Sequence, residues 1–506
     1  MMLALSSSWR KFTLSILVLL ITGIVVAQTK PNVIYIYADD LGYGDLSCYG
    51  ATKLHTPNLD KLASGGIRFT NAHSTSATCT PSRYALMTGE YPWRRAGTGI
   101  LPGDASLIVS TDKITLPKLF KQAGYQTAIV GKWHLGLGDK VQKDWNSDIK
   151  PGPNEVGFDY SFIFPATADR VPTVFLENHK VIAADPADPI EVDYKNKIGN
   201  EPTGKENPEL LKIKSSHGHD NTIVNGIGRI GFMKGGRLAR WADEELSLTF
   251  LQKAKQFIDS NAKKPFFLYY ALTEPHVPRM PATTFKGKSG LGLRGDAILQ
   301  LDWTVGQIMN ELEQTGLTKN TLVIFTSDNG PVLDDGYEDG AVTMLNGHTP
   351  WGPLRGGKYS SLEAGTRLPF ILSWPEKIKP QISDALVCQI DLLASFADLL
   401  HQKIPNGQAV NSENTLKAFL GMSKTGRTIL IEQGTGGASA IIQGDWKYIP
   451  PIDGEAVLKY VNIESGNSAK PQLYNLKDDI GEKNNLAEKY PAKLEELEKL
   501  FQQNIK

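Results

Sequence analysis

The sequence predicts an α/β fold with a large, mostly parallel sheet sandwiched by helices, followed by a smaller antiparallel sheet with one packed helix. Two observations support this prediction. Short apolar segments alternate along most of the chain with amphipathic helical segments, which is typical of parallel strands covered on both faces by helices. Towards the C-terminus the pattern changes to short alternating strands and a charged helix.

The strand candidates are apolar runs bounded by polar or turn residues. They span residues 33–38, 126–130, 266–272, 322–326 and 370–373. Between them, apolar residues recur at spacings of three and four and therefore share one helix face. This spacing predicts helices over 116–123, ended by Gly124, over 246–258, and over 298–312, ended by Gly316.

Residues 165–236 follow neither period. The segment is polar and rich in Asp, Asn, Gly and His. An insertion of this length in a compact domain is usually functional or disordered.

The C-terminal part begins where the composition becomes loop-like, near residues 404–413. Beyond it, the runs 440–442 and 446–449 predict strands, and 486–505 predicts the terminal helix. We therefore expect a leader over residues 1–27, an α/β domain over 28–410 and an antiparallel subdomain over 411–506.

The leader has the features of a secretory signal peptide. Arg10 and Lys11 precede an apolar run over 12–26, and small residues allow cleavage after Ala27. The run is short for a membrane span, although an uncleaved anchor is the alternative. Because no later stretch is apolar enough to cross a bilayer, we expect an exported, periplasmic or secreted protein without stable membrane insertion after cleavage.

The bulk composition restricts the partners. The chain has 506 residues, of which 41% are hydrophobic and 21% charged, as in a folded protein. Its formal net charge is zero, so no global field favours nucleic acid, and none is expected as a partner. Recognition of an anion must be local.

The three cysteines do not form a disulfide framework. Cys48 and Cys388 could pair in an oxidising compartment, but two small buried apolar residues are the default expectation. Their redox state is left open by the sequence.

Two acidic pairs follow predicted strands. Asp39 and Asp40 come after strand 33–38, and Asp328 and Asn329 come after strand 322–326. Ligands of an open α/β sheet bind at the carboxyl ends of its strands, so these side chains should converge. Their oxygens suit Ca²⁺ or Mg²⁺ and not zinc. The alternative is ordinary turn chemistry.

Cys79 lies just before a predicted helix. Pro81 suits the first helical position, and residues 84–88 can continue the helix. Residue 79 would then lie at a helix N-terminus, which favours an anion or a thiolate. On spacing alone, a buried structural cysteine fits equally well.

Six motifs resemble the signatures of the formylglycine-dependent sulfatase family, which has an alkaline-phosphatase-like fold. They are CTPSR at 79–83 with LMTG at 86–89, DDLGYGD at 39–45, HTPNLD at 55–60, GKWHLG at 131–136, TSDNG at 326–330, and RGGK at 355–358 with EAGTR at 363–367. They run in order along the chain and cover nearly all of it after residue 31.

The resemblance implies a sulfatase mechanism. A formylglycine-generating enzyme or an anaerobic sulfatase-maturating enzyme would oxidise Cys79 to formylglycine, whose hydrate is the nucleophile. Asp39, Asp40, Asp328, Asn329 and the modified residue 79 would hold one cation, Ca²⁺ in preference to Mg²⁺.

The resemblance also implies the remaining catalytic roles. Arg83 would hold the oxygens of the hydrate, and Lys132 and Lys358 would bind sulfate. His134 would act as the base on the hydrate. His276 would protonate the leaving oxygen, with Lys358 as the competing donor.

The substrate is indicated only by residues of the insertion. Asp169 and Arg170, with His217 and His219, suit binding of sugar hydroxyl groups, and an ordinary loop ion pair is the alternative. The two histidines could also bind a metal, but no third ligand accompanies them. This segment resembles bacterial carbohydrate sulfatases that act on 6-sulfated galactose or N-acetylgalactosamine.

Other functions stay open at this stage. An arylsulfatase or a sulfatase for another sugar position would share the motifs, and a phosphonate or phosphoester hydrolase would share the fold. A non-catalytic glycan-binding protein would be expected to lack one of Cys79, Lys132, His134 or Lys358, and all are present. The natural glycan, endo or exo action, oligomeric state and modification of Cys79 are not set by the sequence.

Overall fold

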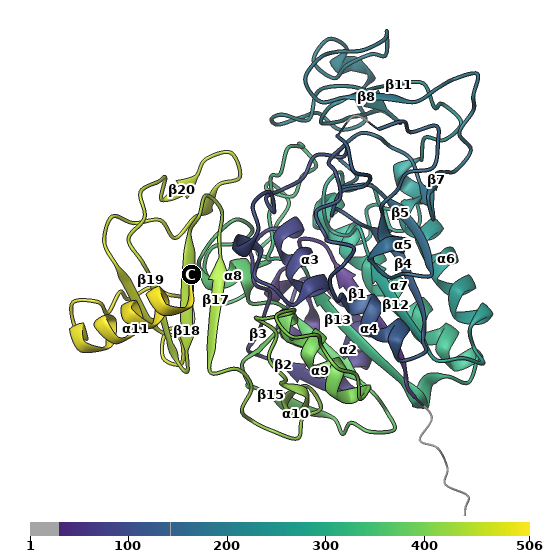
Figure 1. The fold of residues 1–506 in the computed structure, drawn as a ribbon. Coiled ribbons are helices and arrows are strands. Elements are labelled where there is room, and N and C mark those ends of the chain that lie inside the picture. The colour runs from purple at the N-terminus through teal and green to yellow at the C-terminus, as the bar shows by residue number, and fades with distance from the viewer. Residues whose placement is uncertain (1–29, 142, 506) are drawn as a thin grey trace, which may run out of the picture.

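A large sheet forms the centre of the computed structural model, which describes residues 30–141 and 143–505 (Figure 1). Within these residues the sheet has ten strands in the order β15-β2-β14-β13-β1-β12-β4-β5-β6-β7. Their bounds are β1 Asn32–Ala38, β2 Ile67–Phe69, β4 Gln126–Lys132, β5 Tyr160–Phe164, β6 Leu176–Glu177, β7 Lys180–Val181, β12 Phe266–Ala271, β13 Thr321–Ser327, β14 Phe370–Ser373 and β15 Gln381–Ser383. The leader predicted over residues 1–27 lies outside the described residues.

The five central strands are parallel, as the sequence predicts. β1 pairs with β12 on one side and with β13 on the other, and β12, β4 and β5 continue in the same direction. The antiparallel strands β14 and β6 flank this parallel centre. The sheet is therefore mixed and mostly parallel, which confirms the predicted fold class.

Helices cover both faces of the sheet. One face carries α3 Cys79–Thr88, α4 Leu116–Gln122 and α9 Leu392–Leu399, and the other carries α2 Pro57–Ser64, α6 Leu246–Ser260 and α7 Gly292–Gln314. In β1, Val33, Tyr35 and Tyr37 face the first core, and Ile34 and Ile36 face the second. This explains why buried strands read as continuous apolar runs. Within the described chain, no helix is both long and apolar enough to cross a membrane.

The insertion over residues 165–236 has a defined structure. β6 and β7 extend the large sheet, and two small antiparallel pairs follow. The pairs join β8 Glu191–Asp193 with β11 Phe232–Lys234, and β9 Ile223–Val224 with β10 Ile227–Gly228. Figure 1 shows β8 and β11 in a lobe beyond the end of the large sheet.

The predicted C-terminal antiparallel sheet is also present, beside the large sheet (Figure 1). It consists of β17 Ile429–Gln433, β18 Ser439–Gln443, β19 Trp446–Ile449 and β22 Gln472–Asn475. The terminal helix α11 runs over Pro491–Asn504 and packs Leu497 and Phe501 on this sheet. The helix begins later than the predicted residue 486 because Leu486 continues the sheet edge by donating to Leu473, and Pro491 occupies the first turn.

The remaining elements are short. They are β3 Ala72–His73, β16 Val387–Cys388, β20 Val457–Leu458, β21 Ile463–Glu464, α5 Pro153–Val156, α8 Glu363–Thr366 and α10 Leu416–Phe419, with 3₁₀ turns at 43–45, 47–49, 92–94, 208–210, 243–245, 318–320 and 389–391. The predicted boundary at residues 410–411 stays a prediction. Phe419 of α10 packs in a core of the large domain, and the C-terminal sheet begins at Ile429.

Cys48 and Cys388 are not paired. Cys388 is buried in the core of the C-terminal sheet, whereas Cys48 is only partly buried beside the second core of the large sheet. The expectation that both are buried therefore holds for Cys388 alone.

A buried ion cluster joins the C-terminal sheet to the large domain. The ammonium group of Lys447 lies 2.9 Å from Glu363, 3.4 Å from Glu432 and 3.2 Å from Glu482, and all four side chains are fully buried. Burial would raise the pKa of Glu363, but Lys447 outweighs it and the pKa falls to about 2. For Glu482, burial outweighs Lys447 and raises the pKa to about 7. Arg367 also pairs with Glu363 at 3.0 Å and His73 with Glu432 at 2.6 Å, but Lys447 is the cation that the three carboxylates share.

We predict that Lys447→Ala strongly destabilises the protein, because the carboxylates lose their shared buried cation. Breaking a buried charge network in this way costs about 3–5 kcal/mol. The midpoint of urea unfolding should fall accordingly. Lys470→Ala is the matched control, since the Lys470 side chain is 81% exposed and should leave the midpoint unchanged. An unchanged midpoint for Lys447→Ala would contradict the prediction.

Candidate active site

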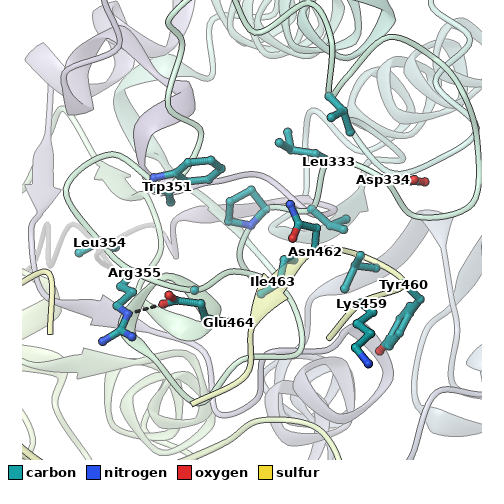
Figure 2. A pocket seen from close by; sticks show the side chains of 15 residues that line it. Leu333, Asp334, Trp351, Leu354, Arg355, Lys459, Tyr460, Asn462, Ile463 and Glu464 are labelled. Carbon is teal, nitrogen blue, oxygen red and sulfur yellow. Dashed lines mark hydrogen bonds and ion pairs between the residues drawn. The ribbon is translucent and has the colours of Figure 1, made fainter. Parts of the chain in front are cut away.

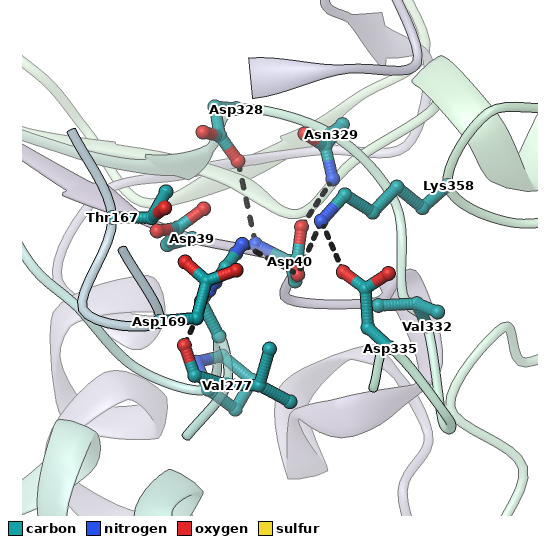
Figure 3. A network of polar contacts seen from close by, with 12 residues as sticks. Asp39, Asp40, Thr167, Asp169, Val277, Asp328, Asn329, Val332, Asp335 and Lys358 are labelled. Carbon is teal, nitrogen blue, oxygen red and sulfur yellow. Dashed lines mark hydrogen bonds and ion pairs between the residues drawn. The ribbon is translucent and has the colours of Figure 1, made fainter. Parts of the chain in front are cut away.

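Two acidic pairs meet at the carboxyl ends of neighbouring strands. Asp39 and Asp40 follow β1, Asp328 and Asn329 follow β13, and the two strands are parallel neighbours. All four side chains are buried. Asn329 donates from Nδ2 to Asp40 at 2.7 Å, and the backbone N–H of Asp40 donates to Asp328 at 3.3 Å (Figure 3). The sheet therefore brings together the oxygen-bearing side chains that the sequence singled out as candidate ligands.

Two buried cations balance the carboxylates of this cluster. Lys132, at the end of β4, donates to Asp39 at 2.6 Å. Arg83 on α3 donates to Asp328 through Nη2 at 2.7 Å and Nε at 3.0 Å. Because the charges come from separate elements, the cluster forms only when the sheet and α3 are assembled.

Lys358 is the third buried cation. Its ammonium group lies 2.9 Å from Asp40 and 2.7 Å from Asp335, and the Tyr359 hydroxyl donates to Asp335 at 3.1 Å. Burial would lower the pKa of Lys358, but Asp335 and Asp40 outweigh it and raise that pKa well above its usual value. Asp335 and Tyr359 were not predicted from the sequence. The only signal was an Asp-Asp pair a few residues after the second acidic motif.

The loop after β1 is held by another buried acid of the same motif. Asp45 accepts two hydrogen bonds from Arg294 on α7, at 2.7 and 2.6 Å, and one from His348 at 2.8 Å. It also accepts the backbone N–H of Gly42 at 2.7 Å. Asp45 thus fixes the loop and is not available to the acidic cluster.

The acidic cluster fits a hard divalent cation. Asp39 Oδ1 and Asn329 Oδ1 are buried and have no hydrogen-bond partner among the described residues. Burial of an unpaired polar atom is costly, and a cation at these oxygens would remove that cost. Burial raises the pKa of Asp39 well above its usual value despite Lys132, and the neighbouring Asp328 and Asp40 add to the shift. Carboxylate and amide oxygens suit Ca²⁺ or Mg²⁺.

Cys79 is the first residue of α3, with Thr78 before it in extended conformation. The sequence had predicted Pro81 at the first helical position, but it is the third residue of the helix. The side chain of Cys79 is 1% exposed. Burial raises the pKa of its thiol, and the nearby Lys132 and Lys358 do not reverse the shift. Reactive thiolates have lowered pKa values and some exposure, so this geometry does not favour a plain cysteine nucleophile.

The two candidate histidines present different ring nitrogens. His134 lies 2.9 Å through Nε2 from the carbonyl of Leu101, so Nε2 carries the proton, and the buried Nδ1 has no partner among the described residues. His276 donates through Nδ1 to the Val277 carbonyl at 2.7 Å and places Nε2 3.7 Å from Asp40. Burial, followed by nearby lysines, lowers both histidine pKa values, so both rings are neutral.

The backbone is strained at three residues of this site. Asp40, His134 and Tyr359 have positive φ angles of 64°, 54° and 76°. Such conformations cost on the order of 1–3 kcal/mol each in residues other than glycine. The surrounding structure must hold them in place, which is common where side chains are aimed at a ligand.

The insertion contributes a second polar group beside the acidic cluster. Asp169 is 2% exposed and accepts from His219 at 2.9 Å and from Arg170 at 3.1 Å. Figure 3 draws Asp169 in the same view as Asp39 and Asp40, and Asp169 interacts electrostatically with His276. Gly336 allows this packing, because a Cβ atom added there would lie 1.8 Å from His219 Nδ1.

Arg229 anchors this part of the insertion. It is fully buried and binds Asp243 at 2.9 and 2.6 Å, and it also donates to the carbonyl of Ala168, next to Asp169. By contrast, the His217 side chain is 36% exposed and lies at the outer edge of this polar group. Its Nδ1 is 3.8 Å from Asp334 Oδ1. The ring nitrogens of His219 contact the His217 carbonyl, at 2.9 Å, and Asp169, whereas the His217 ring contacts Ser216 and Asp334.

The chain is similar to known sulfatases over most of its length. The sulfatase family model matches residues 31–402. An N-acetylgalactosamine-6-O-sulfatase of Bacteroides thetaiotaomicron is 55% identical over 473 residues, which cover 94% of this chain and 93% of that protein. A solved structure from work on glycosaminoglycan metabolism by the same bacterium has a TM-score of 0.93 at 55% identity and covers 94% of this chain and 99% of its own.

A phosphonate monoester hydrolase of Agrobacterium radiobacter shares the fold alone. Its structure has a TM-score of 0.56 at 16% identity, with 94% of this chain and 95% of that chain covered. The architecture is therefore common to hydrolases of different esters.

We predict one divalent cation per chain at the acidic cluster. Asp328→Asn keeps the shape and an acceptor for Arg83 but removes one of the carboxylate charges, so affinity for Ca²⁺ should fall about tenfold or more. Elemental analysis and calorimetric titration measure this directly. Asp302→Asn, a buried acid that binds the start of α2, is the matched control and should keep normal affinity. Two metals per chain, tightly held zinc, or unchanged affinity in Asp328→Asn would contradict this site.

Proposed function

The chain belongs to the sulfatase family and is a sulfuric ester hydrolase, and we propose that it removes the 6-sulfate of N-acetylgalactosamine, or of galactose, in a glycan. The observation that carries this proposal is the 55% identity with an N-acetylgalactosamine-6-O-sulfatase. The alignment spans 473 of the 506 residues, too many to omit the insertion over 165–236. It therefore includes most of this insertion, which contributes Asp169, Arg170 and His219 to the proposed site.

The proposed cofactors are formylglycine, formed from Cys79, and one divalent cation, Ca²⁺ in preference to Mg²⁺. Asp39, Asp40, Asp328 and Asn329 would hold the cation together with the modified residue 79. When bound, these groups supply a nucleophilic oxygen and positive charge beside it. The raised thiol pKa of Cys79 supports the modification, since it argues against catalysis by the unmodified thiolate.

The buried cations would bind the sulfate group. A sulfate ester carries spread negative charge, which is stabilised best by positive groups fixed in a site of low dielectric constant. Lys132 and Lys358 are at most 1% exposed and contact Asp39 and Asp40. Arg83 neutralises Asp328. Asp335 holds the ammonium group of Lys358 at 2.7 Å, together with Asp40.

The histidines would transfer protons. The free Nδ1 of His134 is a buried acceptor without a partner in the described structure, which suits a base for the hydroxyl at residue 79. His276 Nε2 faces the cluster and would protonate the leaving oxygen. Because burial lowers the pKa of His276, it must first gain a proton, whereas Lys358 already carries one. Lys358 is therefore the competing acid.

Substrate recognition is assigned to the insertion. Asp169, Arg170 and His219 form a connected polar group beside the cluster, with His217 at its rim. Charged groups held in this way can bind pairs of sugar hydroxyls. The partners would be a sulfated glycan and the enzyme that matures Cys79. The leader supports export to the periplasm or the medium.

The substrate and the modification can be tested on one preparation. Protein made with a maturing enzyme should show an aldehyde at residue 79 by peptide mass spectrometry. It should release sulfate from 6-sulfated N-acetylgalactosamine at least about 100-fold faster than from the 4-sulfated isomer. Cys79→Ala is the inactive control and should retain the fold by circular dichroism.

Other results would redirect the assignment. A preference for aryl sulfates or for another sugar position would replace the proposed substrate. Faster cleavage of a matched phosphate or phosphonate ester would contradict the proposed reaction. Binding of the glycan without turnover by the aldehyde form would support a non-catalytic role.

The proton donor can be identified by varying the leaving group. If His276 protonates the leaving oxygen, His276→Ala should slow a sulfated sugar by roughly 10²–10⁴-fold and a nitrophenyl sulfate far less, because nitrophenolate leaves without a proton. Lys132→Ala is the comparison variant and should slow both substrates alike. Steady-state kinetics on the two substrates provide the measurement. Equal losses for His276→Ala would assign the proton to Lys358.

A further inference from the structure

A cavity of about 410 Å³ lies between the large domain and the C-terminal lobe, which is the part of the chain from β17 to α11 (Figure 2). The large domain contributes residues 331–334, 342, 351 and 354–356, and the C-terminal lobe contributes residues 459–464, which include β21. None of the proposed catalytic or cation-binding residues lines it. The cavity is therefore distinct from the acidic cluster.

Two aromatic rings connect the cavity to the active site. Tyr460 lines the cavity and is 48% exposed, and its ring centroid lies 5.9 Å from that of Tyr359 and 6.1 Å from that of His217. Tyr359 in turn binds Asp335, which holds Lys358. A molecule that extends from the site past His217 would thus reach Tyr460 and the cavity behind it.

The walls of the cavity suit the faces of a sugar ring. Apolar side chains include Leu333, Val461 and Ile463, and Trp351 and Tyr460 add aromatic surface (Figure 2). Apolar and aromatic walls with a few polar groups are typical of pockets for small organic ligands. Aromatic side chains offer a broad apolar face together with a polar edge, which matches the C–H face and the hydroxyls of a sugar.

The charges that line the cavity are already paired. Arg355 forms an ion pair with Glu464, and Asp334 accepts a hydrogen bond from Ser216. Lys459 is 85% exposed and lies 3.3 Å from Glu455. The cavity therefore lacks a buried, unpaired cation for a second sulfate group, and ring faces and hydroxyls are the groups that it can recognise.

We propose that this cavity binds a second sugar unit, joined to the sulfated one and recognised through its ring face and hydroxyl groups. The inference rests on the proposed glycan sulfatase function and deepens it. Binding of a part of the substrate that does not react can accelerate turnover by positioning the part that does. An oligosaccharide should therefore be a better substrate than the monosaccharide with the same sulfate.

The experiment compares 6-sulfated N-acetylgalactosamine with an oligosaccharide that carries this sugar at its end. Wild-type enzyme should have the higher kcat/KM on the oligosaccharide. Tyr460→Ala should lower that value about tenfold, as expected for loss of an aromatic anchor, and change the monosaccharide value by less than about twofold. Tyr460→Phe keeps the ring and should behave like wild type. Tyr490→Ala is the matched control, because Tyr490 is a 40% exposed aromatic of the same lobe outside the cavity.

A second variant guards against a folding defect at Tyr460. Val342 lines the cavity and is 55% exposed, so Val342→Trp should be tolerated and should fill the space, with a selective loss on the oligosaccharide. Equal kcat/KM of wild type on both substrates, or equal losses on both in Tyr460→Ala and Val342→Trp, would overturn the inference. Failure of the aldehyde form to cleave either substrate would instead overturn the proposed function.

Discussion

Three carboxylates buried side by side at the ends of two parallel strands constrain everything else in this site. Asp39, Asp40 and Asp328 could not remain ionised in the interior without compensation. Lys132, Arg83 and Lys358 provide it, and each comes from a different part of the chain. The register of the sheet, the position of α3 and the loop that carries Lys358 are therefore tied to one electrostatic balance. A cation at the unpaired oxygens would share these carboxylates with the lysines and leave the ammonium groups available to an anionic substrate.

The sequence predicted the features that depend on local pattern. Buried parallel strands give continuous apolar runs. The acidic pairs after two of these runs were expected to converge, and the structure brings them into hydrogen-bonding contact. Helix starts were predicted less well, because Gly292 and Pro491 begin helices without a strong capping signal. Asp335 and Tyr460 could not be found in this way, since their importance comes from contacts between distant segments. The same is true of the difference between the buried His219 and the exposed rim residue His217.

The C-terminal lobe is closely connected to the active site. Lys447 joins it to α8 through Glu363, and the backbone of α8 packs against Gly330, directly after Asn329. A Cβ atom at Gly330 would lie 1.7 Å from the carbonyl oxygen of Ala364, so the two segments touch without any intervening side chain. The position of the second acidic pair thus depends on a charge cluster that the lobe completes. The lobe also forms one wall of the cavity beside Tyr460.

The burial of Cys79 has a consequence for how the protein is made. Every residue of α3 is buried, and Cys79 is 1% exposed. A modifying enzyme cannot reach the Cys79 side chain once α3 has packed against the sheet. The proposed oxidation must therefore take place on the extended chain, while residues 79–83 are still accessible. If residue 79 is oxidised as proposed, a molecule that folds before the oxidation would keep an unmodified thiol.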